Sequence, residues 1–255
     1  MCYNQYKDFV RRKMRLENEV LKQLRERKSV RVFENREVPR DVKDEIIAAA
    51  FEAPTAGNMM LYTIIDVTDS KIKEQLSALC DHQPFIAKAP VVLVFAADYD
   101  KWYKMFSAAG LSPRKPGPGD LLLACSDALI AAQNSVTAAH SLGLGSCYIG
   151  DILENGGKVR KLLSLPEYTL PAVMVVYGYP TRQQRERKKP GRFEKEHIVH
   201  TNSYREMQPE ELLRMYGENG SRESLEAFCK RKYMSDFSME MNRSVSEHLK
   251  NFMDR

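Results

Sequence analysis

The chain has 255 residues, 43% of them hydrophobic, so it can bury the core of one large domain with or without extensions. Its formal net charge of +5 leaves room for an anionic cofactor but does not indicate nucleic acid as a partner. Five cysteines without C-x-x-C spacing argue against a zinc site or a disulfide framework and favour reduced thiols in the cytoplasm. The first twenty residues are charged and lack the apolar stretch of a signal peptide.

Residues 4–26 predict an amphipathic helix, because their apolar side chains recur on one side. In the extended stretch that follows, Arg27, Ser29 and Arg31 alternate and therefore face the same side. Two guanidinium groups beside a hydroxyl suit a phosphate, since arginine offers a planar fork of donors and a permanent charge. The same alternation also fits a solvated strand with incidental charges.

The next part of the chain alternates between predicted helices and strands. A helix is expected from Pro39 to Pro54, a strand over 61–67, a helix over 70–79 and a fully buried strand over 90–97. Between the first helix and the first strand, residues 53–58 read APTAGN. This small-residue turn either lets the backbone approach a flat ligand closely or is an ordinary loop.

Residues 99–118 predict a short helix and a long loop that resembles a lid over a site. Their aromatic side chains either pack against the core or contact a substrate. The aromatics are Trp102, Tyr103 and Phe106.

The segment over 121–142 predicts a central helix whose small residues allow close packing on every side. Its length alone would cross a membrane, but Asp127 and His140 favour burial inside protein, at a subunit interface. Gly143 and Gly145 end this helix, and a short strand over 146–149 leads directly into Gly150. We expect this arrangement to deliver a glycine backbone amide to a bound ligand.

The remaining core elements are a short helix over 155–164 and a last strand over 172–178. Residues 182–195 are strongly basic. They form either a solvated loop or, through Arg192, the rest of a phosphate cradle. The tail from Gln208 onward reads as helical with one apolar stripe, which needs either its own core or a partner subunit to cover it.

The sequence shows no recognisable catalytic motif of its own. The two glycines at 143 and 145 follow a helix and precede a strand, the reverse of a dinucleotide-binding turn. A Walker A lysine, a G-x-S-x-G elbow and H-E-x-x-H spacing are also missing from the sequence. A cofactor that carries its own chemistry needs only positioning and electrostatics from the protein, which fits this pattern.

Taken together and in order, the motifs resemble those of the flavin-dependent nitroreductase family over roughly residues 20–205. They are R-x-S-x-R from Arg27, A-P-T-A-x-N from Ala53, Ala89-Pro90 before a valine-rich strand, G-L-G-S-x-Y-I-G from Gly143, and the closing Y-G-Y-P from Tyr177. The resemblance implies an α+β fold, with a mixed, mainly antiparallel sheet flanked by helices. It also implies an intertwined homodimer with FMN at the interface.

The resemblance further implies a role for each matching residue. Arg27, Ser29, Arg31 and Arg192 would hold the FMN phosphate with help from Lys189, and Lys28 would contact the flavin through its backbone. Pro54, Thr55, Ala56 and Asn58 would come from the other subunit to the flavin ring, and Ile149, Gly150 and Asp151 would lie along that ring, with a backbone N–H aimed at flavin N5. No side chain is assigned as catalytic, no metal is expected, and Met60 stands where the family commonly has glutamine.

The function implied is an FMN-dependent oxidoreductase that passes hydride from NADH or NADPH to a small electron-poor acceptor such as a nitroaromatic or a quinone. Two alternatives remain: a flavin-binding sensor or storage module without robust turnover, and a specialised branch such as reductive dehalogenation or flavin destruction. We expect an FMN-binding domain over 1–205 and a C-terminal helical extension over 206–255 that packs on the dimer. Neither nucleic acid nor a membrane is expected as a partner.

Overall fold

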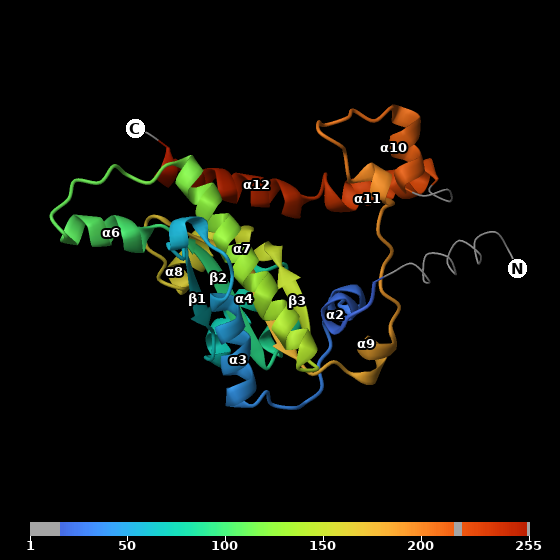
Figure 1. Ribbon diagram of the computed structural model, residues 1–255, viewed down its shortest axis with the longest axis horizontal. Helices are drawn as coiled ribbons and strands as arrows, with labels where there is room; N and C mark the ends of the chain where they lie inside the picture. Colours follow the sequence, from blue (N-terminus) through green and yellow to red (C-terminus); the bar gives the residue numbers. More distant parts are fainter. Residues whose placement is uncertain (1–15, 217–220, 254–255) are drawn as a thin grey trace, which may run out of the picture.

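The computed structural model describes residues 16–216 and 221–253, in which an antiparallel four-stranded sheet is the central element. The strands are β1 (Tyr62–Asp66), β2 (Val91–Asp98), β3 (Gly145–Ile149) and β4 (Thr169–Gly178), in the order β1-β2-β4-β3. A parallel bridge between Ser29 and Ser146 adds one extended residue beside β3, so the pairing is mixed and mainly antiparallel, as predicted. Figure 1 shows helices in front of and behind this sheet.

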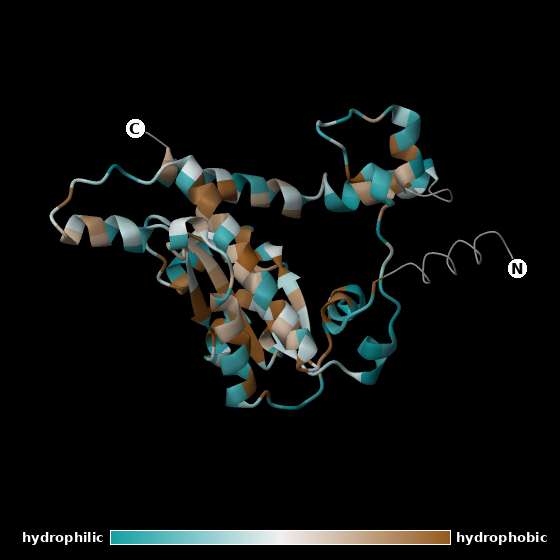
Figure 2. Ribbon diagram, in the orientation of Figure 1, coloured by the Kyte–Doolittle hydropathy of each residue, from teal (hydrophilic) through white to brown (hydrophobic). Residues whose placement is uncertain are grey.

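Each face of the sheet has its own hydrophobic core. On one face, β-strand residues such as Phe95 and Tyr177 pack against α3 (Arg40–Phe51) and α7 (Pro118–Ser141). On the other face, residues such as Val94 and Met174 pack against α4 (Ser70–Leu79), α5 (Pro84–Ala87) and α8 (Gly156–Leu162). All eight residues of β2 are buried, which explains why the first seven, residues 91–97, are all apolar. In Figure 2 the apolar colour accordingly runs along the strands.

The last strand is longer than the sequence pattern predicted. β4 begins at Thr169, three residues before the predicted start at 172, and it includes Pro171. The register between β2 and β4 shifts between Phe95 and Ala96, next to Pro171. Proline, which lacks an N–H group, is tolerated in a sheet at such an irregularity.

Helix α7 runs through the middle of the molecule, close to its predicted span. Pro118 starts it, and Asp120 accepts a hydrogen bond from the backbone of Gly117 at 2.8 Å, which caps the first turn. Gly143, with φ of +81°, ends the turn that follows. The helix is long and apolar enough to cross a membrane by length and composition. Ten of its residues are nevertheless buried within the protein.

The N-terminal helix is shorter than the predicted helix over 4–26. α2 spans Glu19–Glu26, and the Asn18 side chain caps it by accepting a hydrogen bond from the Leu21 N–H at 2.9 Å. Residues 16–18 are not helical, so the prediction is wrong there, because an asparagine cap satisfies the first N–H groups and starts a new helix. Residues 4–15 lie outside the described part of the chain.

The smaller elements connect the sheet and extend the chain beyond it. They are α6 (Asp100–Ala108), α9 (Arg182–Glu186), α10 (Pro209–Tyr216), α11 (Arg222–Lys232), α12 (Asp236–Leu249), and the 3-10 turns η1 (Ala56–Asn58), η2 (Gly150–Leu153), η3 (Lys195–His197) and η4 (Lys250–Phe252). Figure 1 shows α10 and α11 away from the sheet, whereas α12 returns to it and ends near the start of α7. Neither α10 nor α11 has a buried residue.

Candidate functional site

The segment after α2 lies along the edge of the sheet, against β3. The Val30 N–H donates to the Ser146 carbonyl at 2.8 Å, and the Val30 side chain packs directly on Gly145. A Cβ atom at position 145 would lie 2.5 Å from Val30 Cγ2, so only glycine allows this approach. The sequence therefore places residues 27–31 in a fixed position beside β3.

A second segment, after α9, is tied to the first by side-chain hydrogen bonds. Lys28 Nζ donates to the Arg185 carbonyl at 2.6 Å and also to the Arg187 carbonyl, and Arg187 Nη2 donates to the Ser29 carbonyl at 2.6 Å. Lys189 Nζ donates to the Arg25 carbonyl at 2.6 Å. These bonds join parts of the chain about 160 positions apart and bring their cationic side chains together.

Three cations gather where these segments meet: Arg27, Lys189 and Arg192. Burial, followed by the neighbouring guanidinium groups of Arg192 and Arg27, lowers the pKa of Lys189. Arg27 Nη1 is buried and has no hydrogen-bond partner among the described residues. Like charges held together in this way are unfavourable unless an anion joins them. The cluster is therefore a candidate anion site, and its donors suit a phosphate.

Ser29 and Arg31 lie close to Cys147 on β3. Burial raises the pKa of the Cys147 thiol, while the Arg31 guanidinium and the Ser29 hydroxyl oppose this rise. Arg27 also acts on this thiol, so all three residues of the alternating segment lie near Cys147 of β3. Among the described residues, Arg31 makes a hydrogen bond only through its backbone N–H, which lies 3.5 Å from Gln184 Oε1. Its guanidinium group therefore remains able to bind a phosphate.

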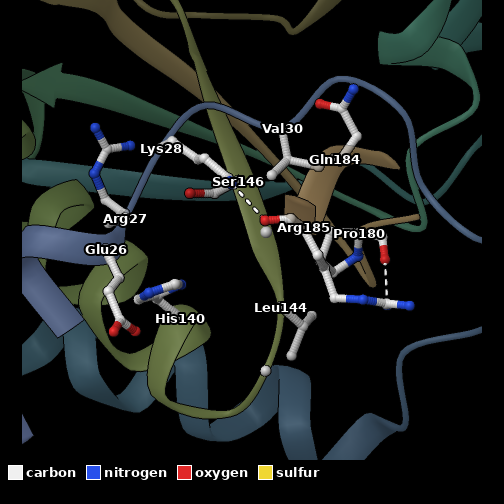
Figure 3. A pocket seen from close by; sticks show the side chains of 12 residues that line it. Glu26, Arg27, Lys28, Val30, His140, Leu144, Ser146, Pro180, Gln184 and Arg185 are labelled. Carbon is white, nitrogen blue, oxygen red and sulfur yellow. Dashed lines mark hydrogen bonds between the residues drawn. The ribbon is translucent and has the colours of Figure 1, made fainter. Parts of the chain in front are cut away.

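A cavity of about 380 Å³ opens beside this segment, on the side of Lys28 and Val30. Figure 3 shows Arg27 and Lys28 at one end, His140 and Glu26 below them, and Leu144 and Arg185 on the opposite side. Its size suits a small organic ligand, and its walls combine cations with apolar groups. Burial lowers the pKa of His140. The sequence signal for this histidine is its position near the end of a mostly apolar helix.

At its other end, β3 leads into the predicted flavin-ring residues. Ile149 is buried, whereas Gly150 is exposed, and a Cβ atom there would meet nothing within 4 Å. The Asp151 carboxylate accepts a hydrogen bond from Gln83 Nε2 at 2.6 Å. Ile149 lies three positions after Ser146, so β3 spans roughly 10 Å between the cationic cluster and this open end.

Gln83 is a site residue that the sequence did not reveal. It follows Asp81 and His82, which both adopt positive φ angles of 56° and 49°. Such consecutive left-handed residues are unusual outside glycine and have no clear sequence signature here. They turn the chain so that the Gln83 amide reaches Asp151.

The predicted turn Pro54–Asn58 is held at a different place, on α7. The two carboxylate oxygens of Asp127 accept hydrogen bonds from the N–H groups of Ala56 at 3.0 Å and Leu61 at 3.1 Å. Thr55 Oγ1 accepts from the Met60 N–H at 3.3 Å. Figure 1 shows this turn, which follows α3, on the far side of α7 from α2. A single chain therefore does not bring it to the cationic cluster.

The aromatics of the predicted lid pack within the protein. Trp102 Nε1 donates to the Met59 carbonyl at 2.7 Å, and its ring contacts Phe106 with centroids 5.5 Å apart. Tyr103 contacts Tyr168 at 5.2 Å. Within the described residues, no group of three or more His, Cys, Asp or Glu side chains could hold a metal ion.

The order of these features along one chain matches a known family. The sequence model of the nitroreductase family matches residues 24–179, which include the end of α2, the whole sheet and α7. The chain belongs to the nitroreductase family. Its predicted α+β fold is confirmed by solved structures. A putative oxidoreductase from Bacteroides fragilis superposes with a TM-score of 0.83 at 28% identity, covering 91% of this chain and 100% of the other.

Relatives of known activity agree with this assignment. An FMN reductase from Bacillus subtilis is 35% identical over 73% of this chain and 75% of its own length. An oxygen-insensitive NADPH nitroreductase from Salmonella typhimurium is 35% identical over 75% of this chain and 76% of its own. A Cr(VI) reductase from a Pseudomonas species is 30% identical over 90% of this chain and 95% of its own length.

Proposed function

We propose that this nitroreductase family member binds FMN, oxidises NADH or NADPH, and passes the electrons to a small electron-poor acceptor. The observation that carries the proposal is the cluster of Arg27, Lys189 and Arg192, in which Arg27 Nη1 is buried and has no hydrogen-bond partner in the part of the chain that the structure describes. A phosphate monoester supplies both the negative charge and the acceptor oxygens that this cluster lacks. The names of the relatives, FMN reductase and NADPH nitroreductase, support the same cofactor and donor.

In this proposal the two ends of β3 have separate roles. Arg27, Ser29, Arg31, Lys189 and Arg192 hold the phosphate, and the Lys28 backbone contacts the flavin while its side chain fixes the 185–187 segment. Ile149, Gly150 and Asp151 line the ring. When bound, FMN supplies the hydride-transfer chemistry. The exposed backbone at Gly150 offers an N–H donor without a side chain in the way, which stabilises negative charge on the ring.

The complete site requires a second copy of the chain, because the turn Pro54–Asn58 lies beyond α7 in each copy. The exposed face of α7 supports this homodimer: it carries Leu122, Leu123, Leu129 and Ile130, which are 70%, 50%, 45% and 40% exposed. A helix face of this kind needs a partner surface to exclude water. In the dimer, that face meets the other copy and each turn reaches the other copy's flavin ring.

The extension over 206–255 is assigned to the same dimer, beyond an FMN-binding domain over 1–205. Its α10 and α11 have no buried residue in one copy, and they expose the large apolar side chains of Leu213 and Phe228. We therefore assign these two helices to the contact with the other copy. We assign the protein to the cytoplasm. The described cysteines are all free thiols, which suits a reducing compartment.

Arginine substitutions test the phosphate assignment. Losing one charge-assisted contact weakens binding by about 1.5–3 kcal/mol, which is about a ten- to hundredfold rise in Kd. We therefore expect Arg27→Ala and Arg31→Ala to purify with less FMN per chain and an unchanged far-UV circular dichroism spectrum. Arg182→Ala is the matched control, because Arg182 lies in the same basic region but pairs with Glu186 on the surface of α9. Full FMN occupancy in either cradle variant would refute that residue's role.

A further inference from the structure

The C-terminal helix α12 packs closely on the first residue of α8, Gly156. A Cβ atom at Gly156 would lie 2.7 Å from His248 Cε1 and 2.9 Å from its Nδ1. The Gly156 N–H donates to Ser244 Oγ at 2.9 Å, and both Ser244 and His248 are buried. Glycine at the start of α8 thus lets the histidine ring lie directly on the helix backbone.

The two ring nitrogens of His248 have different surroundings. One ring nitrogen makes a hydrogen bond with the Ser244 backbone one turn earlier, the geometry of a donor to a helical carbonyl. Nε2 is buried and has no partner among the described residues, and the side chain as a whole is 6% exposed. A second proton on the ring would place a charge at Nε2, where no described residue accepts its hydrogen bond. The docked position therefore disfavours the protonated ring.

The charges around His248 also oppose its protonation. Burial, followed by the Arg160 guanidinium on α8, lowers the pKa of His248, and Glu247 on α12 opposes this effect only in part. Glu247 is itself paired with Lys250 at 2.6 Å. The other charged groups at the junction act on one another: Arg243 pairs with Glu240, and Lys158 of α8 and Glu154, the residue after η2, also interact with Glu240.

The contact at His248 holds the end of the chain on the core. Just beyond it, Asn251 Nδ2 donates to the Glu167 carbonyl at 3.3 Å. Phe252 is 1% exposed and meets Tyr168 edge-on, with ring centroids 5.7 Å apart. The same cluster contains Leu61, whose N–H is bound by Asp127 together with the turn Pro54–Asn58. The docked tail therefore supports the backbone that leads from this turn into β1.

We propose that His248 is a proton-sensitive latch, which keeps α12 and Phe252 docked on the core while it is neutral and releases them when it is protonated. The docked state disfavours the proton, while an undocked histidine titrates at its ordinary pKa of about 6.5. Docking is therefore fully favoured above pH 6.5. It weakens below 6.5, by up to about tenfold per pH unit, until the pH passes the lower pKa of the docked state.

Hydrogen exchange of the full-length protein tests the latch directly. Peptides covering 244–252 are compared at pH 7.5 and pH 5.5, after correction for the intrinsic dependence of exchange on pH. We expect their protection factors to fall several-fold at pH 5.5 in the wild type. His248→Phe keeps an aromatic ring against Gly156 but cannot take up a proton, so its protection factors should not change with pH. His82→Asn is the control, because His82 is exposed and asparagine tolerates its positive φ.

The wild-type protein supplies a second readout that does not depend on the variant folding. Nuclear magnetic resonance titration of the histidine ring protons gives the midpoint for His248, assigned by its disappearance in His248→Phe or His248→Gln. A midpoint below 6.5 is expected. A midpoint at or above 6.5, or the same loss of protection in His248→Phe as in the wild type, would overturn the proposal. Neither readout requires bound FMN.

Discussion

Asp127 is the residue through which α7 holds the predicted flavin-ring turn, and its removal should be costly. Asp127 is 3% exposed, and each of its carboxylate oxygens accepts one backbone hydrogen bond, one from the Ala56 N–H and one from the Leu61 N–H. Leaving one buried N–H unpaired costs about 1–3 kcal/mol. Asp127→Ala leaves two and should lower the free energy of unfolding by about 4 kcal/mol. Asp127→Asn keeps one acceptor and should cost about half as much, roughly 2 kcal/mol.

Urea unfolding followed by circular dichroism measures these differences. All variants are compared at one protein concentration, because association of two copies shifts apparent stability. Ser126→Ala is the control. Ser126 is the preceding residue on the same helix and is exposed, and its hydroxyl donates a hydrogen bond to the Leu122 carbonyl of its own helix. A cost below about 1 kcal/mol for Asp127→Ala, or an Asn variant less stable than the Ala variant, would refute the role of the two N–H bonds.

Two further substitutions test the placement of the first cradle segment and the cap of α7. Gly145→Ala puts a methyl group 2.5 Å from Val30 Cγ2 and should therefore displace residues 27–31. We expect the free energy of unfolding to fall by about 1–3 kcal/mol and the FMN content of the purified protein to fall as well. Wild-type occupancy and stability would contradict the close approach. Asp120→Asn removes the ion pair with Arg114, which is the main cause of the lowered pKa of Asp120. The difference in free energy of unfolding between the wild type and this variant should therefore be present above pH 4 and shrink as the pH falls through the lowered pKa of Asp120. A difference that stays constant down to pH 2 would exclude a charge effect.

The main elements of the fold were predictable because each carries a local signal. β2 is apolar up to its last residue, α7 consists mostly of apolar and small residues, and Gly143 has the positive φ that a helix end favours. The phosphate cradle was predictable in part, since Arg27, Ser29 and Arg31 alternate along one extended segment. The cluster that includes Lys189 depends on hydrogen bonds between segments about 160 positions apart, which no local pattern specifies. The resemblance to a family pointed to it instead.

Other features could not be read from the sequence because their causes are tertiary. The positive φ angles of Asp81 and His82, which aim Gln83 at Asp151, occur in residues that do not require them. An apolar stripe on the tail showed that α12 needs a surface but not which surface it covers. The structure shows that its last turn and Phe252 pack on the core of the same chain.

The visible absorption spectrum of the purified protein, recorded before and after heat release of any chromophore, tests the central claim most directly. We expect a flavin spectrum at about one FMN per chain, with NADH or NADPH bleaching it and a quinone restoring it. Retained colour without such turnover would favour a flavin-binding sensor or storage protein. A colourless protein that also fails to take up added FMN would contradict the assignment of Arg27, Lys189 and Arg192 as a phosphate site.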